Sequence, residues 1–182
     1  MQVLNIHERE LEASHDQVGA LIDSLSSEYD RLWPNHSWPR MKFDRPLSIG
    51  ADGGHGPIRY FVEDYNPGHS IKFRFTNPKG FKGFHRYEIV KSTQTSVLLR
   101  HTIKMAIQGS AMLTWSLFLR SLHDALLEDS LTTAQASLGM IPQIQAWSPW
   151  VKIIRWVMSG GKAKPQIRPN NLFQRQAKYL DC

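Results

Sequence analysis

Three titratable side chains that could do chemistry lie within six residues of one another: His123, Asp124 and Glu128. A histidine beside a carboxylate is a pairing that general acid–base catalysis uses, because the carboxylate can orient the imidazole and stabilise its charged form. All three belong to the stretch WSLFLRSLHDALLEDSL, residues 115–131, which has no glycine or proline and is typical of an α-helix. Their chemistry therefore depends on which side of that helix each one occupies.

A helical wheel separates the apolar and charged sides of this stretch. At 100° per residue, the expected sheet-facing stripe consists of Trp115, Leu119, Leu122 and Leu126. Arg120, Asp124 and Glu128 fall on the opposite side as i, i+4 neighbours, which indicates a solvated face and not a catalytic group. His123 borders the apolar stripe and points about 100° away from Asp124. We therefore expect no dyad, although the imidazole could reach the rim of a cavity.

A second group of reactive side chains lies on two predicted strands. His85 and Tyr87 alternate with charged residues in FHRYEIV, residues 84–90, and His101 alternates in the same way in VLLRHTIKM, residues 97–105. Most of the other residues on their face are apolar, which predicts that all three side chains point inward. We expect the two strands to pair as a hairpin, so that His85 and His101 lie on one face with Tyr87 close by.

The sequence leaves three interpretations of these side chains open. A histidine with a pKa near neutrality could move a proton while a tyrosine polarises a carbonyl, which makes His85, Tyr87 and His101 candidate catalytic residues. The same groups could anchor a mainly apolar ligand, or could be buried residues bonded to the backbone or to water. We favour anchoring over catalysis, since buried polar groups are commoner than catalytic ones. Two histidines without a third convincing ligand predict no metal site, and no cofactor is indicated.

The remaining elements must position these residues. Residues 3–12 read as a half-buried strand with two sides, Leu4 and Ile6 against Asn5, His7 and Arg9. Two short helices are expected next, one capped by Ser14 and one across SEYDRLW, residues 27–33. From Met41 onward come short strands separated by Pro, Gly and Asn turns, which favour an antiparallel meander. Residues 110–138 then form one long helix that ends at Gly139.

The sequence thus predicts an α+β fold in which a curved antiparallel sheet wraps a long C-terminal helix, with two short helices after the first strand. A helix of that length can cover one face of the sheet and leave a pocket between them. The loop GADGGHGP, residues 50–57, lacks the lysine and hydroxyl of a phosphate-binding loop. We expect it to flank the pocket mouth, with His55 exposed to solvent.

This pattern resembles the START-like superfamily, also called SRPBCC or polyketide cyclase/dehydrase-like, which has the helix-grip fold. The resemblance covers roughly residues 1–139, the predicted domain, and is carried by GPIRYFVEDYNPGHSIKFRF, GFHRYEIV, VLLRHTIKM and LLEDSLTTAQASLG. It implies a hydrophobic cavity between sheet and helix, and members include lipid carriers and polyketide cyclases. The predicted ligand-binding residues are Tyr60, Phe73, Phe75, His85, Tyr87, His101, Ile103, Met105, Trp115, Leu119, Leu122 and His123.

Bulk composition agrees with one globular domain plus an extension. The 182 residues are 41% hydrophobic and 21% charged, no apolar run could span a bilayer, and the N-terminus does not read as a signal peptide. The single cysteine, Cys182, excludes an internal disulfide, and a cytoplasmic location is expected. The net charge of +6 arises entirely after Gly139, since acidic and basic residues cancel before it.

The extension, residues 140–182, is basic and rich in tryptophan. Its segment 147–158 carries Trp150, Ile153, Ile154, Trp156 and Val157, with Lys152 and Arg155 together on one side. We expect this segment to dock on the body of the protein or to form a homodimer, with peripheral membrane contact as the alternative. The charge comes without a recognised nucleic-acid motif, so nucleic acid is the weakest candidate partner. The predicted function is binding of a small hydrophobic molecule, lipid or polyketide-like, with a cyclase or dehydratase as the alternative.

Overall fold

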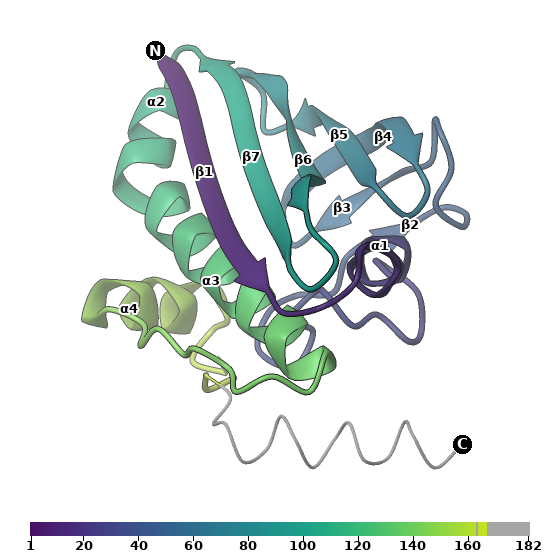
Figure 1. Ribbon diagram of the computed structural model, residues 1–182. Helices are drawn as coiled ribbons and strands as arrows, with labels where there is room; N and C mark the ends of the chain where they lie inside the picture. Colours follow the sequence, from purple (N-terminus) through teal and green to yellow (C-terminus); the bar gives the residue numbers. More distant parts are fainter. Residues whose placement is uncertain (163, 167–182) are drawn as a thin grey trace.

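The computed structural model describes residues 1–162 and 164–166. Its centre is a seven-stranded antiparallel sheet in the order β1-β7-β6-β5-β4-β3-β2 (Figure 1). The strands are β1 (Gln2–Leu11), β2 (Lys42–Phe43), β3 (Asp52–His55), β4 (Ile58–Asn66), β5 (Ser70–Asn77), β6 (Phe81–Ser92) and β7 (Val97–Ile107). Strands β2 to β6 each pair with the next strand along the chain. Strand β1 pairs with β7 and forms the other edge of the sheet. The predicted meander is confirmed.

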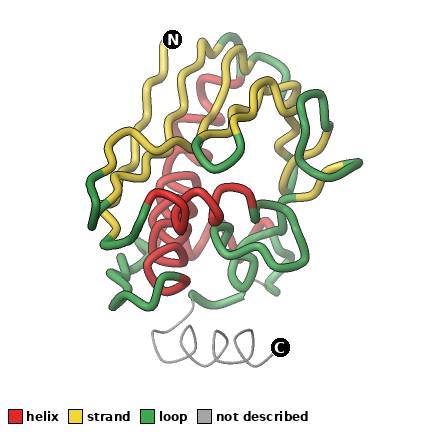
Figure 2. The backbone as a smooth tube through the Cα atoms, turned by 45° about the vertical axis from the view of Figure 1, so that its right-hand side comes forward, coloured by secondary structure: helices red, strands yellow, loops and turns green. Residues whose placement is uncertain are grey.

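A single rod follows the last strand and crosses one face of the sheet (Figures 1 and 2). It is formed without a break by α2 (Ala111–Thr114), η1 (Trp115–Leu119) and α3 (Arg120–Ser137). The rod ends where Gly139 adopts a φ of 75°, a left-handed conformation that glycine takes without strain. The α+β helix-grip architecture expected from the sequence is therefore present, with the core between the sheet and the rod.

Only one of the two short helices expected after the first strand is formed. Helix α1 (His15–Asp23) begins at Ser14, whose side chain accepts a hydrogen bond from the backbone N–H of Gln17. Residues 27–33, where the second helix was expected, form turns and bends instead. The cause is Asp30, whose carboxylate accepts hydrogen bonds from the backbone N–H groups of Ser26, Leu32 and Trp33. Because these backbone N–H groups bond to the Asp30 side chain, the segment can satisfy them without forming a helix.

Strand β1 turns its polar side toward the rod. Leu4 and Ile6 are 66% and 46% exposed, whereas Asn5, His7 and Arg9 are partly buried beneath α3. The strand is half-buried as the alternation predicted, but the buried half is the charged one. Polar groups can be buried there because α3 offers them charged and amide partners.

The glycine-rich stretch at residues 50–57 is more regular than the turn expected from the sequence. It contains strand β3, which lies between β2 and β4. A Cβ on Gly54 would lie 2.0 Å from the carbonyl oxygen of Ile58, so the two strands can approach this closely only with glycine there. Tyr60 and Val62 are fully buried on β4.

The extension packs on the domain through helix α4 (Pro149–Met158), which begins after Ser148 and lies beside α3 (Figure 1). Val151, Ile154 and Arg155 are buried by this contact. None of the helices in the described part of the chain is long and apolar enough to cross a bilayer. Cys182 and the basic residues after Gln166 lie outside the described residues.

Candidate ligand-binding site

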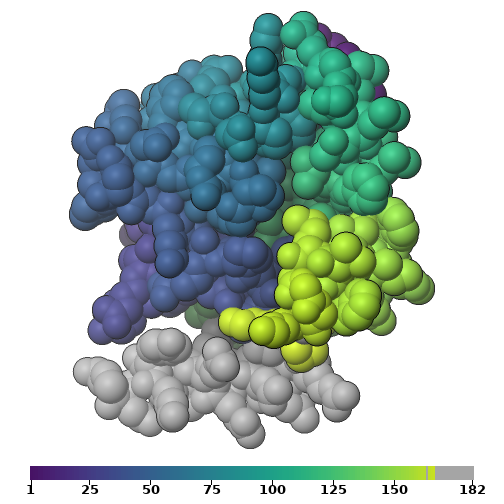
Figure 3. Space-filling view, turned by 180° about the vertical axis from the view of Figure 1, so that it is seen from behind, coloured from purple at the N-terminus to yellow at the C-terminus, as the bar shows by residue number. Residues whose placement is uncertain are grey.

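A cavity of about 540 Å³ lies between the sheet and the rod and opens toward α4. In the space-filling view, α4 meets the rod and the segment before β3 on the face where this opening lies (Figure 3). Most of its walls are apolar side chains, and the polar groups among them include four imidazoles. The residues that define the lining are Trp33, Trp38, His55, Ile58, Phe75, Phe81, His85, His101, Ile103, Trp115, Leu119, Leu122, His123, Leu126, Leu127, Arg155, Met158, Lys162 and Lys164.

Most of the predicted ligand-binding residues line this cavity. They are Phe75, His85, His101, Ile103, Trp115, Leu119, Leu122 and His123. Tyr60, Phe73, Tyr87 and Met105 do not reach it and are buried in the core. Strand alternation predicts which face of the sheet a residue occupies. It does not predict whether other side chains or a cavity lie opposite that face, and other side chains cover these four residues.

Tyr87 is the clearest correction among the candidate catalytic residues. It lies directly opposite His101 in the β6–β7 register, as expected from the hairpin. Its hydroxyl, however, lies 2.8 Å from Ser130 Oγ on α3. The Ser130 hydroxyl donates to the carbonyl oxygen of Leu32, so the Tyr87 hydroxyl must donate to Ser130. Burial raises the pKa of Tyr87 well above its ordinary value. This phenol ties the sheet to the rod and does not face a ligand.

His85 and His101 form a buried imidazole pair. The Nδ1 of His85 lies 3.2 Å from the Nε2 of His101, so one of these two nitrogens donates and the other accepts. Burial, together with repulsion from neighbouring histidines, holds the pKa of both rings well below the ordinary value, so the pair is neutral. The nitrogens that remain, His85 Nε2 and His101 Nδ1, are the outer nitrogens of the pair. Whichever ring donates within the neutral pair, one outer nitrogen is a donor and the other is an acceptor.

His55 is part of the cavity wall and is not the solvated loop residue that the sequence suggested. Its Nδ1 lies 2.9 Å from the Tyr60 hydroxyl, and its ring centroid lies 4.8 Å from that of Trp33. Burial lowers the pKa of His55 to about 3. The glycine-rich segment flanks the cavity as expected, but it folds inward because the Trp33 indole covers it.

A wide helical turn explains why His123 lines the cavity. Residues 115–119 form a π-helical turn, which holds one residue more than an α-helical turn. Every residue after it is therefore rotated by about 100° relative to a regular helical wheel. His123 moves from the border of the apolar stripe toward its centre, and Asp124 moves from the solvent side toward β1. The wheel failed because it assumed a regular helix.

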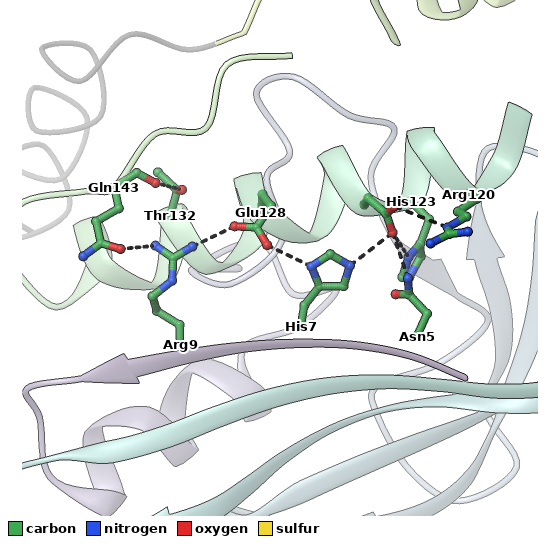
Figure 4. Close-up of polar contacts among 9 residues, drawn as sticks. Asn5, His7, Arg9, Arg120, His123, Glu128, Thr132 and Gln143 are labelled. Carbon is green, nitrogen blue, oxygen red and sulfur yellow. Dashed lines mark hydrogen bonds and ion pairs between the residues drawn. The ribbon is translucent and has the colours of Figure 1, made fainter. Parts of the chain in front are cut away.

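The acidic residues of α3 consequently contact β1 and do not form a purely solvated face. His7 places Nε2 3.2 Å from Asp124 Oδ1 and Nδ1 2.8 Å from Glu128 Oε1 (Figure 4). Burial works against a charge on His7, but the hydrogen bonds to both carboxylates outweigh it and raise its pKa to about 9. The expected i, i+4 contact between Arg120 and Asp124 is present at 3.9 Å.

Sequence reasoning missed a cluster that joins the extension to the cavity wall. Trp38 and Trp147 both donate their indole N–H to Asp129 Oδ2, at 2.7 and 2.9 Å. The guanidinium of Arg155 lies over both indoles, 4.0 and 4.2 Å from their ring centroids, and the two indoles meet edge to face with their centroids 5.5 Å apart. Burial raises the pKa of Asp129, and the indole and amide donors oppose that rise. The tryptophans in the stretches WPNHSWP and AWSPW were the available signal, but the sequence does not show that they meet.

An apolar collar borders the mouth of the cavity. We define it as the exposed side chains Leu117, Phe118, Trp150, Ile153, Trp156, Val157 and Met158. Phe118 stacks on Trp150, whose indole N–H donates to the carbonyl oxygen of Leu117. Met158 belongs to both the collar and the cavity lining. Docking of the extension thus buries Trp147, but Trp150 and Trp156 stay 45% and 60% exposed.

Comparisons with known proteins agree with this architecture. No family model and no curated protein matches the sequence. Norcoclaurine synthase from Thalictrum flavum, solved with dopamine and hydroxybenzaldehyde, superposes with a TM-score of 0.58 at 13% identity, covering 76% of this chain and 88% of that one. This chain has the START-like helix-grip fold. The di-domain aromatase/cyclase StfQ of the steffimycin pathway has a TM-score of 0.54 at 15% identity, covering 74% of this chain and 50% of its own.

A third helix-grip structure, from Thermobifida fusca, has a TM-score of 0.54 at 14% identity and covers 72% of this chain and 93% of that one. At these identities the likeness concerns the fold alone. The helix-grip domain of this chain therefore has to be assigned a function from its own cavity.

Proposed function

We propose that the protein holds a small, mainly apolar molecule in the cavity between sheet and rod. The observation that carries this proposal is a pair of buried nitrogens, His85 Nε2 and His101 Nδ1, without a hydrogen-bond partner among residues 1–162 and 164–166. Leaving a buried polar atom unpaired costs about 1–3 kcal/mol. A ligand with one hydrogen-bonding group would recover that energy while the apolar walls hold the rest of it. A volume of about 540 Å³ suits a small organic molecule.

The polar groups of the cavity narrow the class of ligand. Because His85 and His101 are neutral, they favour a hydroxyl, phenol or carbonyl over a carboxylate at the buried end. Lys162 and Lys164 line the other end and are exposed, so they favour a negative group at the mouth. The ligand that fits is amphiphilic and lipid-like or polyketide-like. Since norcoclaurine synthase was solved with dopamine and hydroxybenzaldehyde, phenols belong among the first compounds to test.

The test is ligand capture by the full chain and by a cavity-filling variant. Protein purified under native conditions is extracted with organic solvent, and binding of oleate and of 4-hydroxybenzaldehyde is measured by titration. Leu119→Trp fills the cavity and should weaken binding at least tenfold, whereas Leu113→Trp, on an exposed position of the same rod, should leave it unchanged. Equal affinity in both variants, or no binding and no extracted molecule, would contradict a ligand cavity.

A catalytic role is the second candidate, supported by the imidazole pair. Its hydrogen bond lets a proton shift from one ring to the other, so that one outer nitrogen gives up a proton as the other gains one. That property suits cyclisation or dehydration of a polyketide-like substrate, without Tyr87. Conversion of an extracted ligand that stops in His101→Gln while binding persists supports this role. Release of unchanged ligand by both proteins supports a carrier.

We propose further that the apolar collar contacts an anionic membrane surface. The collar combines exposed Trp150, Trp156 and Phe118 with nearby Lys152, Lys162 and Lys164. Tryptophan favours the interface between water and hydrocarbon, and lysine favours anionic headgroups. Because Met158 belongs to both collar and cavity, a bilayer in contact with the collar would lie at the cavity mouth.

Vesicle sedimentation separates this proposal from dimer formation. Binding to vesicles that contain phosphatidylserine, but weakly to phosphatidylcholine alone, is expected for the full chain and should fall at least tenfold in Trp150→Ser/Trp156→Ser. The control is Ile49→Ser, which is equally exposed on a different surface. A stable dimer by light scattering that Trp156→Ser dissociates would show instead that a second copy covers the collar.

A further inference from the structure

The rod and β1 bring three potential metal ligands together at the edge of the sheet. His7, His123 and Asp124 each offer a donor atom, and these atoms all lie within 4.8 Å of one another. Figure 4 shows His7 on β1 facing the rod, which carries His123, with Asn5 and Glu128 nearby. We propose that His7, His123 and Asp124 bind a divalent transition-metal ion of the zinc class. This proposal does not depend on the function proposed for the cavity.

The distances are close to those that a metal ion requires. Ligand atoms of a four-coordinate zinc ion lie about 3.3 Å apart, since each is roughly 2.0–2.2 Å from the metal. His7 Nε2 and Asp124 Oδ1 are already 3.2 Å apart. His123 Nδ1 lies 3.8 Å from the same oxygen, and all three donor atoms lie within 4.8 Å of one another, so the His123 ring must move toward the other two ligands to complete the site.

The surrounding residues are those that hold metal ligands in place. Glu128 accepts from His7 Nδ1 at 2.8 Å, which is the carboxylate–histidine contact that commonly fixes the tautomer of a metal-bound imidazole. Glu128 is held in turn by Arg9 at 2.8 Å. Asn5 donates to Asp124 Oδ1 at 2.9 Å and orients that carboxylate. Each ligand other than His123 is thus positioned by a second residue.

An ion pair between His7 and the two carboxylates explains part of the cluster but leaves His123 unexplained. Within the described part of the chain, neither ring nitrogen of His123 has a hydrogen-bond partner, although both are buried. Its ring lies beside a carboxylate and within 5.8 Å of the His7 ring centroid. A buried imidazole without a partner is costly, and a metal ion at this point would satisfy it.

Titration of the metal-free full chain tests the site. EDTA-treated protein in a Cys182→Ser background is titrated with ZnCl₂ by calorimetry and with CoCl₂ by visible absorption. We expect one equivalent to bind at micromolar concentration or below, with cobalt absorption bands of nitrogen and oxygen coordination. Asp124→Asn and His7→Gln should weaken binding at least a hundredfold, and Glu128→Gln by about 10–100-fold, the usual effect of losing a supporting carboxylate.

His123→Gln is the decisive variant, because the polar contact of His123 that the substitution would break in the metal-free protein is a long one, 3.8 Å to Asp124. It should leave the Tm of the metal-free protein nearly unchanged while removing the rise in Tm that zinc gives the parent. His15→Gln is the matched control, since His15 and His69 form a separate imidazole pair 3.3 Å apart. Absence of stoichiometric binding, or binding that survives His123→Gln and is lost in His15→Gln, would overturn the proposal.

Discussion

His85 Nδ1 and His101 Nε2 lie 3.2 Å apart on adjacent strands, and both residues line the cavity. The two residues are diagonal neighbours, because His85 is paired with Ile103 and His101 with Tyr87. Each ring thus satisfies one nitrogen of the other and leaves its second nitrogen unpaired among the described residues. The pair therefore presents unpaired hydrogen-bonding atoms inside an apolar cavity. Their energetic cost can be measured as a change in the free energy of unfolding when the rings are replaced.

Replacing the two histidines together should cost less than the sum of the single replacements. His101→Leu leaves His85 with no partner and should lower the free energy of unfolding by about 1–3 kcal/mol, as should His85→Leu. The double variant removes both rings, including the two nitrogens that are unpaired in the parent, and should be at least as stable as the parent. Urea denaturation of the four proteins gives the coupling energy. Additive losses would mean that the pair does not act as a unit.

Stability should fall as the pH drops from about 6.5 toward 3, because His55 is buried in its neutral form. Its folded-state pKa is about 3 against an ordinary value of 6.5, so in this interval the unfolded chain takes up a proton that the folded chain does not. Each such histidine lowers the free energy of unfolding by about 1.4 kcal/mol per pH unit within that window. The low pKa results from burial, with repulsion from His123 and Arg59.

The variant His55→Asn should flatten this pH dependence. Tm measured between pH 7 and 4 should fall less steeply for His55→Asn than for the parent. The difference should correspond to the uptake of roughly one proton fewer on unfolding. The Tyr60 hydroxyl, which faces His55, stays protonated throughout the range because burial raises its pKa. An unchanged slope would show that His55 is charged in the folded protein.

Arg155 should be essential for docking the extension. Replacement by lysine keeps a positive charge but loses the planar group that contacts both Trp38 and Trp147. We expect Arg155→Lys to lower the free energy of unfolding by about 2 kcal/mol. Lys152→Met, on an exposed position of the same helix, should change it by less than about 0.5 kcal/mol. Similar effects of the two substitutions in thermal melts would contradict the stacked arrangement.

The π-helical turn should tolerate loss of one residue better than the rest of the rod. Deleting Ser116 would convert residues 115–119 to a regular α-helical turn and leave α3 in place against the sheet. Deleting Ser121 would instead rotate the following residues by about 100° and pull Leu126 and Leu127 out of the core. The Tm of the Ser116 deletion should therefore exceed that of the Ser121 deletion by several degrees. The reverse order would mean that the wide turn is required for folding.

Local pattern was enough to predict the meander, the strand phases and the face shared by His85 and His101. Period-2 alternation and turn residues act over a few neighbours, so they can be read directly. The same reasoning misplaced His55, because nothing in GADGGHGP shows that Trp33 will cover it. It also placed Asp124 on the solvent side of the helix, because five residues of π-helix change the phase of everything that follows.

The sequence by itself determined the fold class, since strand and helix periods and their order leave few ways to bury the apolar faces. It also placed the imidazoles of β6 and β7 on an inward face. Only the tertiary structure decided that Tyr87 is hydrogen-bonded to Ser130, that Arg155 contacts two indoles, and that His7 meets His123 and Asp124. Those contacts join residues that are distant along the chain, and their geometry is set by how the rod, β1 and the extension pack against one another.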